Sequence, residues 1–144
     1  SIFFLCQKLV YTAKTHFREM VLTQFGFTDG REVGILFIAM DTQLSQTEIA
    51  NIMEIDKNTT RFFIDDLEQW GLLQRQKNST NRKEYLIIIT PEGKKQAKKI
   101  FSATLQHERE LLHTLSDEEF TTLHKLLAKF FYSIDSTTHT LAHK

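Results

Sequence analysis

The sequence has few of the residues that interrupt or cross-link a chain. Its 144 residues include one cysteine, one proline and five glycines. A single cysteine excludes an intrachain disulfide framework, and so little turn chemistry predicts long helices. No apolar run approaches the roughly 20 residues that cross a bilayer, and the longest, Tyr85 to Ile89, has the length of a strand. We therefore expect no membrane partner.

We also expect no export signal in these residues, and what precedes Ser1 is not part of the sequence. The apolar stretch Ile2 to Leu5 is too short for the core of a signal peptide, so a cytoplasmic setting is expected. The length fits one domain that buries its own core. With 41% hydrophobic and 25% charged residues, the composition is that of a folded domain rather than a disordered chain.

The net charge of the whole sequence is zero, but the charged residues are unevenly distributed along it. The stretch from Gln74 to Lys99 holds eight basic and two acidic residues, a net charge of +6, against 10 basic and 16 acidic residues, a net charge of −6, in the rest. The basic residues of this stretch are Arg75, Lys77, Arg82, Lys83, Lys94, Lys95, Lys98 and Lys99. Such a segment is typical of a surface that binds a polyanion. A solvated helix face followed by a charged hairpin is the alternative.

Hydrophobic periodicity predicts two helices in the first 40 residues. Apolar residues recur near the helical period from Ile2 to about Gln24, and Gly26 with the Thr28-Asp29-Gly30 cluster ends that segment. Arg31 to Met40 is apolar nearly all round. This pattern predicts a short helix buried in the middle of the fold.

Two helix starts then follow in quick succession. Ser45-Gln46-Thr47-Glu48 is a capping box, in which the Ser45 and Glu48 side chains each accept a backbone amide. Asp56 offers a second N-cap. Apolar positions continue from it at helical spacing to Trp70-Gly71: Thr60, Phe63, Ile64 and Leu67. Two capped helices so close together predict a helix-turn-helix.

A hairpin and two more helices complete the predicted order. Leu73 to Lys77 alternates, Asn78 to Lys83 is polar, and Tyr85 to Ile89 is rich in β-formers, which predicts a hairpin with a basic tip. Thr90-Pro91-Glu92 restarts a helix that we expect to reach about Leu115. Ser116 to Glu119 is a second capping box, opening a helix with an apolar face to Ile134. The predicted fold class is mainly α with a small β-hairpin wing.

A helix-turn-helix followed by a basic hairpin is a winged helix, whose second helix has the dimensions to enter the major groove of DNA. Asn58 suits an adenine edge, Arg61 a guanine edge and Phe62 a thymine methyl, while Thr59 suits a phosphate or a base. The candidate DNA-binding residues are Ser45, Gln46, Thr47, Lys57, Asn58, Thr59, Arg61, Phe62, Arg75, Arg82 and Lys83. Each of them is equally acceptable as an ordinary exposed side chain.

From Leu44 to Gly93 the sequence resembles the MarR-type (multiple antibiotic resistance regulator) winged-helix transcription factors. Leu44 to Ala50 is similar to the first helix of the family's helix-turn-helix, and Asp56 to Thr60 to the entry of its recognition helix. Leu67 to Leu73 resembles the exit into the wing, and Leu86 to Gly93 the return strand with its Thr-Pro-Glu-Gly helix start. The helices before and after this region fit as well.

The resemblance implies an obligate homodimer that binds a pseudo-palindromic double-stranded DNA operator, usually as a repressor released by a small ligand or an oxidant. It implies one domain over 1–144, with a winged-helix lobe at about 31–99 and a helical dimerisation region at about 1–25 and 100–144. The apolar faces of Ile2 to Val10 and of Ser116 to Ile134 would supply dimer surface, with packing inside one monomer as the alternative. No cofactor is expected, and the effector would be a small apolar or aromatic molecule.

Three positions depart from the family pattern. Glu54 stands where the family often has glycine in the turn, which predicts a strained or differently shaped turn. Phe62 stands where arginine is common, which shifts specificity away from a guanine contact. In the wing, Asn81-Arg82-Lys83 replaces Asp-X-Arg, so Lys83, with Arg82 as its substitute, is the expected minor-groove cation. Lysine lacks the planar fork of arginine, so we expect weaker readout of groove width.

Redox and metal sensing have little sequence support. Cys6 lies where one-cysteine peroxide sensors of the family carry theirs, but Arg31 to Asp41 contains none of the tyrosines that accompany it. Both a redox role and a role as a small buried hydrophobic residue stay open for Cys6. His139 and His143 have the i, i+4 spacing of helical metal ligands, but no third ligand is indicated, so no metal site is predicted.

Catalysis is not expected either. The sequence has no glycine-rich phosphate loop, no paired cysteines, no nucleophile elbow and no His-Glu-X-X-His motif. The alternative to a DNA-binding regulator is a winged helix used as a protein-interaction module, since Asp65, Asp66 and Glu68 make the second helix less positive.

Overall fold

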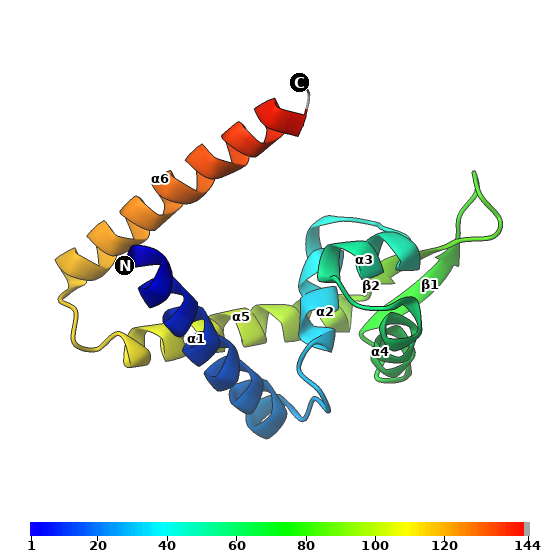
Figure 1. Ribbon diagram of the computed structural model, residues 1–144. Helices are drawn as coiled ribbons and strands as arrows, with labels where there is room; N and C mark the ends of the chain where they lie inside the picture. Colours follow the sequence, from blue (N-terminus) through cyan, green and yellow to red (C-terminus); the bar gives the residue numbers. More distant parts are fainter. Residues whose placement is uncertain (143–144) are drawn as a thin grey trace. The chain divides into compact units, whose positions relative to one another are not determined.

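The computed structural model describes the backbone of residues 1–142 and the side chains of residues 1–134. Along the chain its elements are α1 (Ile2–Phe25), α2 (Glu32–Asp41), α3 (Gln46–Met53), α4 (Lys57–Gln69), β1 (Leu73–Lys77), β2 (Tyr85–Ile89), α5 (Pro91–Leu111) and α6 (Asp117–Ala142) (Figure 1). The order confirms the predicted class, mainly α with a small hairpin. None of the described helices has the length and hydropathy that a membrane crossing requires.

The chain forms two compact units, Ser1–Leu105 and Gln106–Lys144. The first contains α1 to α4, the hairpin and most of α5. The second contains the end of α5 and α6. In the second unit, Ser116 and Glu119 form the predicted capping box, with amide-to-side-chain distances of 2.9 and 3.1 Å.

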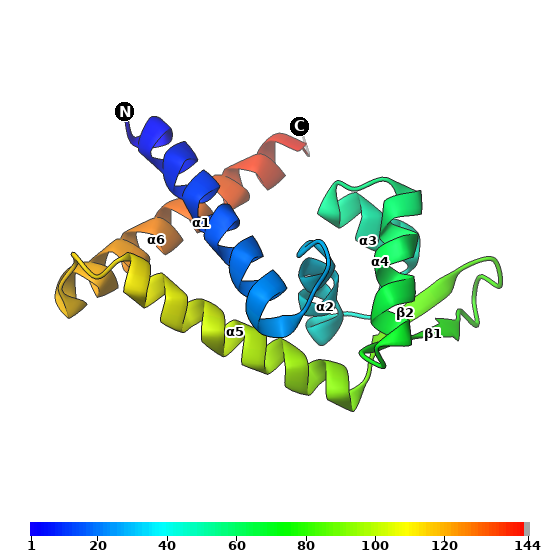
Figure 2. The same cartoon turned by 90° about the horizontal axis from the view of Figure 1, so that it is seen from below.

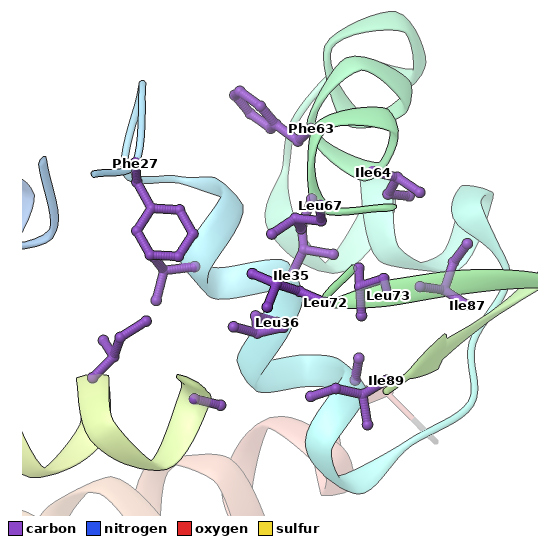
Figure 3. Close-up of a cluster of buried hydrophobic side chains, with 14 of the residues drawn as sticks. Phe27, Ile35, Leu36, Phe63, Ile64, Leu67, Leu72, Leu73, Ile87 and Ile89 are labelled. Carbon is purple, nitrogen blue, oxygen red and sulfur yellow. The ribbon is translucent and has the colours of Figure 1, made fainter. Parts of the chain in front are cut away.

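The core of the first unit lies between α2, α4 and the hairpin, where the labelled side chains of these elements gather (Figure 3). α2 is buried as predicted, with Val33, Ile35 and Leu36 fully inaccessible to solvent. The other elements contribute Phe63, Ile64 and Leu67 from α4 and Leu73, Ile87 and Ile89 from the hairpin. Each large aliphatic side chain buried here contributes about 1.5 to 3 kcal/mol. This burial fixes which face of α4 points away from the core.

The helix-turn-helix is built from local caps. The Glu48 amide donates to Ser45 Oγ at 3.2 Å, and the Ser45 amide donates to the Glu48 carboxylate at 2.8 Å, so the predicted capping box is present. Asp56 caps α4 through the Thr59 amide at 2.8 Å. Between the helices Glu54 adopts a left-handed conformation, with φ 55°. This confirms the strained turn, because a side chain in that region costs on the order of 1 kcal/mol.

The hairpin is antiparallel and pairs Leu73 with Ile89, Arg75 with Ile87 and Lys77 with Tyr85. On its other side β2 is joined to the start of α3, since the Ile87 amide donates to the Leu44 carbonyl at 2.9 Å. Residues 78–84 form the tip, which extends beyond the paired strands in both views (Figures 1 and 2). The predicted wing is therefore confirmed and is tied to the helix-turn-helix at its base.

One predicted boundary was wrong. The helix that begins at Pro91 ends at Leu111 instead of continuing to Leu115. The Leu115 amide turns back to the Leu112 carbonyl at 3.0 Å, and this tight turn brings Ser116 into place as the next cap. The apolar residues Leu112 and Leu115 kept the helical spacing, which concealed the break.

Candidate nucleic-acid interface

The outward face of α4 carries the side chains predicted to read bases. Its buried face is formed by Thr60, Phe63, Ile64 and Leu67, which leaves Lys57, Asn58, Arg61 and Phe62 exposed. Phe62 is 60% exposed, and the Arg61 guanidinium lies 5.5 Å from its ring centre. The exposed ring offers an apolar surface on the same face of α4 as Asn58 and Arg61.

Thr59 lies on the same helix, and it is bonded to the N-cap residue Asp56. Its hydroxyl donates to Asp56 at 2.6 Å, and its amide donates to the same carboxylate at 2.8 Å. These bonds hold the pKa of Asp56 below its usual value, because they favour the charged carboxylate. The hydroxyl proton of Thr59 is thus engaged in the cap. Thr59 therefore helps to begin α4, and its contact with a phosphate or a base stays a prediction.

The start of α3 faces the wing. Gln46 and Thr47 from α3, with Lys83 and Tyr85 from the wing, line a hollow of about 140 Å³. Ser45 borders the same hollow, but it is only 2% exposed and its hydroxyl belongs to the capping box. The side chain of Ser45 therefore starts the helix, and its contact with DNA stays a prediction.

The wing tip presents Arg82 and Lys83 to solvent. Asn81 organises the tip, since its side chain accepts the Lys83 amide at 3.1 Å and its carbonyl accepts the Glu84 amide at 3.1 Å. In the part of the chain with described side chains, no acidic group forms an ion pair with Lys57, Arg61, Arg82 or Lys83. These cations stand available to a polyanion.

Arg75 was predicted to contact DNA, and the structure places it differently. Its guanidinium forms ion pairs with Asp65 at 2.6 Å and Glu68 at 3.0 Å, and its side chain is only 17% exposed. Without DNA, both ends of the fork are taken up by carboxylates of α4, and the direct contact with DNA stays a prediction.

The remaining basic residues lie apart from this surface. Lys94, Lys95, Lys98 and Lys99 are exposed on α5, outside the helix-turn-helix and the wing. The basic residues of the +6 stretch are therefore divided, and of them Arg82 and Lys83 lie at the wing tip while four lie on α5.

The ion pairs that Asp65 and Glu68 form with Arg75 were not predicted from the sequence. The two acidic residues were expected only to make the second helix less positive, whereas in the structure they bind Arg75. The alternation of β1 puts Arg75 on the same face as the core residue Leu73, but alternation alone does not show which residues of α4 it meets.

The residues considered for redox or metal chemistry do not come together in a site among the described side chains. Cys6 is half-buried on α1. Among the described residues no group of three or more histidine, cysteine, aspartate or glutamate side chains is placed to hold a metal ion. The side chains of His139 and His143 lie outside the described residues.

Together, two capped helices, an exposed second helix and a cationic hairpin define a winged helix-turn-helix protein. A family model described as the MarR family matches residues 38–85. The chain is 32% identical over 122 residues to a putative transcriptional regulatory protein for the hcr operon of Thauera aromatica, a match that covers 85% of this chain and 73% of that protein. The chain belongs to the MarR family, which consists of transcriptional regulators and not of enzymes.

Two further comparisons agree with this membership. The HTH-type transcriptional repressor YetL of Bacillus subtilis (strain 168) is 25% identical over 131 residues, which is 91% of this chain and 77% of that protein. The crystal structure of wild-type MarR in its apo form from E. coli matches with a TM-score of 0.75 at 18% identity, covering 86% of this chain and 94% of that one. The structural match supports the winged-helix fold.

Proposed function

We propose that this protein is a sequence-specific regulator that binds a pseudo-palindromic double-stranded DNA operator as a homodimer. The observation that carries the proposal is the exposed face of α4, whose cations have no ion pair among the described residues and lie beside an equally free cationic wing. A relative named as a repressor favours repression as the outcome of binding.

Each part of the surface has a role in this proposal. Asn58 and Arg61 read adenine and guanine edges in the major groove, and Phe62 packs on a thymine methyl. Lys57, with Gln46 and Thr47 at the start of α3, binds backbone phosphates. At the tip, Lys83 and Arg82 enter or flank the minor groove.

Binding is expected to depend steeply on salt, and the wing is expected to supply part of that dependence. Replacing Arg82 and Lys83 with alanine should weaken binding to all sequences and reduce the slope of log K against log[salt] by about 1 for each phosphate that is no longer neutralised. The affinity and its salt slope are measured by fluorescence anisotropy with a labelled duplex of about 30 base pairs. The protein itself selects this duplex from a random library.

A matched control removes two charges elsewhere. Replacing Lys98 and Lys99 on α5 with alanine should leave the slope close to that of the wild type. A wild-type protein that shows no salt-dependent affinity for any duplex would favour the protein-interaction module and end the proposal.

The homodimer is proposed from apolar faces that the described chain leaves open. On α1, Ile2, Phe3, Phe4, Leu5, Leu9 and Val10 are each more than half exposed. On α6, the exposed apolar residues include Leu126, Leu127, Phe130, Phe131 and Ile134. Apolar surface exposed along each of these two helices is typical of an association site. Because packing within the described chain does not cover it, a second copy is the occupant we propose.

Deleting Ser1 to Val10 should convert the dimer to a monomer, since it removes the exposed apolar half of α1. Multi-angle light scattering at a fixed protein concentration measures the change, and concentration must be held constant because dimer stability depends on it. Lys14→Ala on the same helix should stay dimeric. A monodisperse dimer after the deletion would place the interface elsewhere.

A small aromatic effector is the last part of the proposal. Within the first unit, Phe25, Phe27, Trp70 and Leu72 line a hollow of about 350 Å³ together with Gly26, Glu92 and Gln96. That volume is at the lower end of small-molecule sites, and the Glu92 carboxylate favours an aromatic amine over an aromatic acid. Trp70 is the C-cap of α4, so occupancy would act on the end of the reading helix. It is the only tryptophan in the sequence, and its fluorescence reports the binding.

A further inference from the structure

The Arg75 side chain touches both helices of the helix-turn-helix from its place on the wing. From β1, its Nη1 donates to Glu68 Oε1 at 3.0 Å and its Nη2 donates to Asp65 Oδ1 at 2.6 Å, both on α4. Its Nη2 also lies 3.5 Å from Gln46 Oε1 on α3. The Arg75 amide donates to the second oxygen of Glu68 at 3.1 Å.

Periodicity places Arg75 on one face of β1 and its two carboxylate partners on one face of α4, and the fold brings the two faces together. Arg75 shares a face of β1 with buried Leu73 and stands opposite buried Ile87, so its aliphatic stem runs beside the core. Asp65 and Glu68 are three residues apart and therefore neighbours on α4. A planar guanidinium with five donors matches two such carboxylates in a way that a lysine ammonium does not.

These contacts matter because of how charge is distributed along α4. Its first half carries Lys57 and Arg61, and its second half carries Asp65, Asp66 and Glu68. Acidic groups near the carboxyl end of a helix are disfavoured by its dipole, and close to DNA they would repel phosphates. Among the described residues, Arg75 is the cation bonded to Asp65 and Glu68.

We propose that Arg75 is a positioning residue of the DNA-reading surface: it neutralises Asp65 and Glu68 and holds α4 against the wing without itself contacting DNA. This inference rests on the proposed function and deepens it. It accounts for a recognition helix that carries acidic residues in its second half.

The test uses the full-length protein and the selected duplex described above. R75Q should weaken binding about tenfold, because two carboxylates lose their partner beside the phosphates. Adding D65N and E68Q to R75Q should restore affinity to within about threefold of the wild type and keep the wild-type salt slope, since every phosphate contact of the wild type is still made. The control is K77Q, because Lys77 lies on the same strand but has no ion pair among the described residues. Adding D65N and E68Q to K77Q should not restore its affinity for the duplex.

The opposite pattern would overturn the inference. If Arg75 binds a phosphate directly, the triple variant binds as weakly as R75Q, and its salt slope is smaller than that of the wild type by about 1. Unchanged affinity of R75Q would overturn it as well. If R75Q does not fold, the triple variant alone decides, because it carries neither Asp65 nor Glu68 as an unpaired carboxylate. Failure of the proposed function shows separately, as a wild-type protein with no affinity for DNA.

Discussion

Replacement of Glu32 by alanine is expected to lower the free energy of unfolding by about 3 to 5 kcal/mol. Glu32 is the first residue of α2 and is fully buried. One of its oxygens accepts the amides of Thr28 and Asp29 at 2.9 and 3.1 Å, and the other accepts the Gly30 amide at 2.9 Å. Three consecutive backbone donors thus converge on one carboxylate, and without it they lose their partner in a site with little access to water.

Urea denaturation at fixed protein concentration measures this effect as a lower midpoint with an unchanged slope. Glu32→Gln keeps the shape and one acceptor oxygen but turns an amide donor toward a backbone N–H, so an intermediate loss is expected. Glu19→Ala, on the exposed side of α1, should change stability by less than about 0.5 kcal/mol. A Glu32→Ala protein as stable as the wild type would show that the loop reorganises to meet solvent.

Gly93→Ala is the second substitution from which we expect a large loss, about 3 kcal/mol. Gly93 lies in the first turn of α5, where an added Cβ would stand 2.1 Å from the Leu72 carbonyl oxygen and 2.8 Å from Ile89 Cγ1. That carbonyl already accepts the Thr90 amide at 3.0 Å. The clash is with backbone in a bonded turn and not with a flexible side chain, so α5 must move away from the exit of α4.

Gly34→Ala is the matched control. Its Cβ would also be close to a neighbour, 2.7 Å from Met53 Cε, but that atom is the free end of a flexible side chain that moves at little cost. Alanine also favours the helix by about 0.5 to 1 kcal/mol, so the two effects should nearly cancel. Thermal melts that give Gly93→Ala and Gly34→Ala the same midpoint would show that the contact with Leu72 is not tight.

The features that could be predicted from the sequence are those fixed by neighbouring residues. Ser45, Asp56 and Ser116 are caps whose partners lie three residues away, and all three act as predicted. The hairpin followed from alternation and a polar tip, and the buried face of α4 followed from its helical period. Such short-range patterns depend little on the rest of the fold.

The features that could not be predicted depend on elements that meet only after folding. Arg75 contacts Asp65 and Glu68 across separations of ten and seven residues, and the contact needs the register of β1 against α4. A count of charges could not show whether this arginine faces DNA or its own chain. Likewise, the burial of Glu32 depends on a loop that curls around its carboxylate, and the polar identity of the residue gave no warning of it.

Both edges of the hairpin are partly covered by other residues of the chain, which limits strand pairing with another molecule. Along β2 the outer side is occupied by the segment at Leu44 and Ser45, and along β1 the central outward amide is held by Glu68. A two-stranded ribbon normally invites a third strand from another molecule, which is a route to misassembly. Here the central outward donors of both edges are held, Ile87 by Leu44 and Arg75 by Glu68, so pairing of strands between molecules is discouraged.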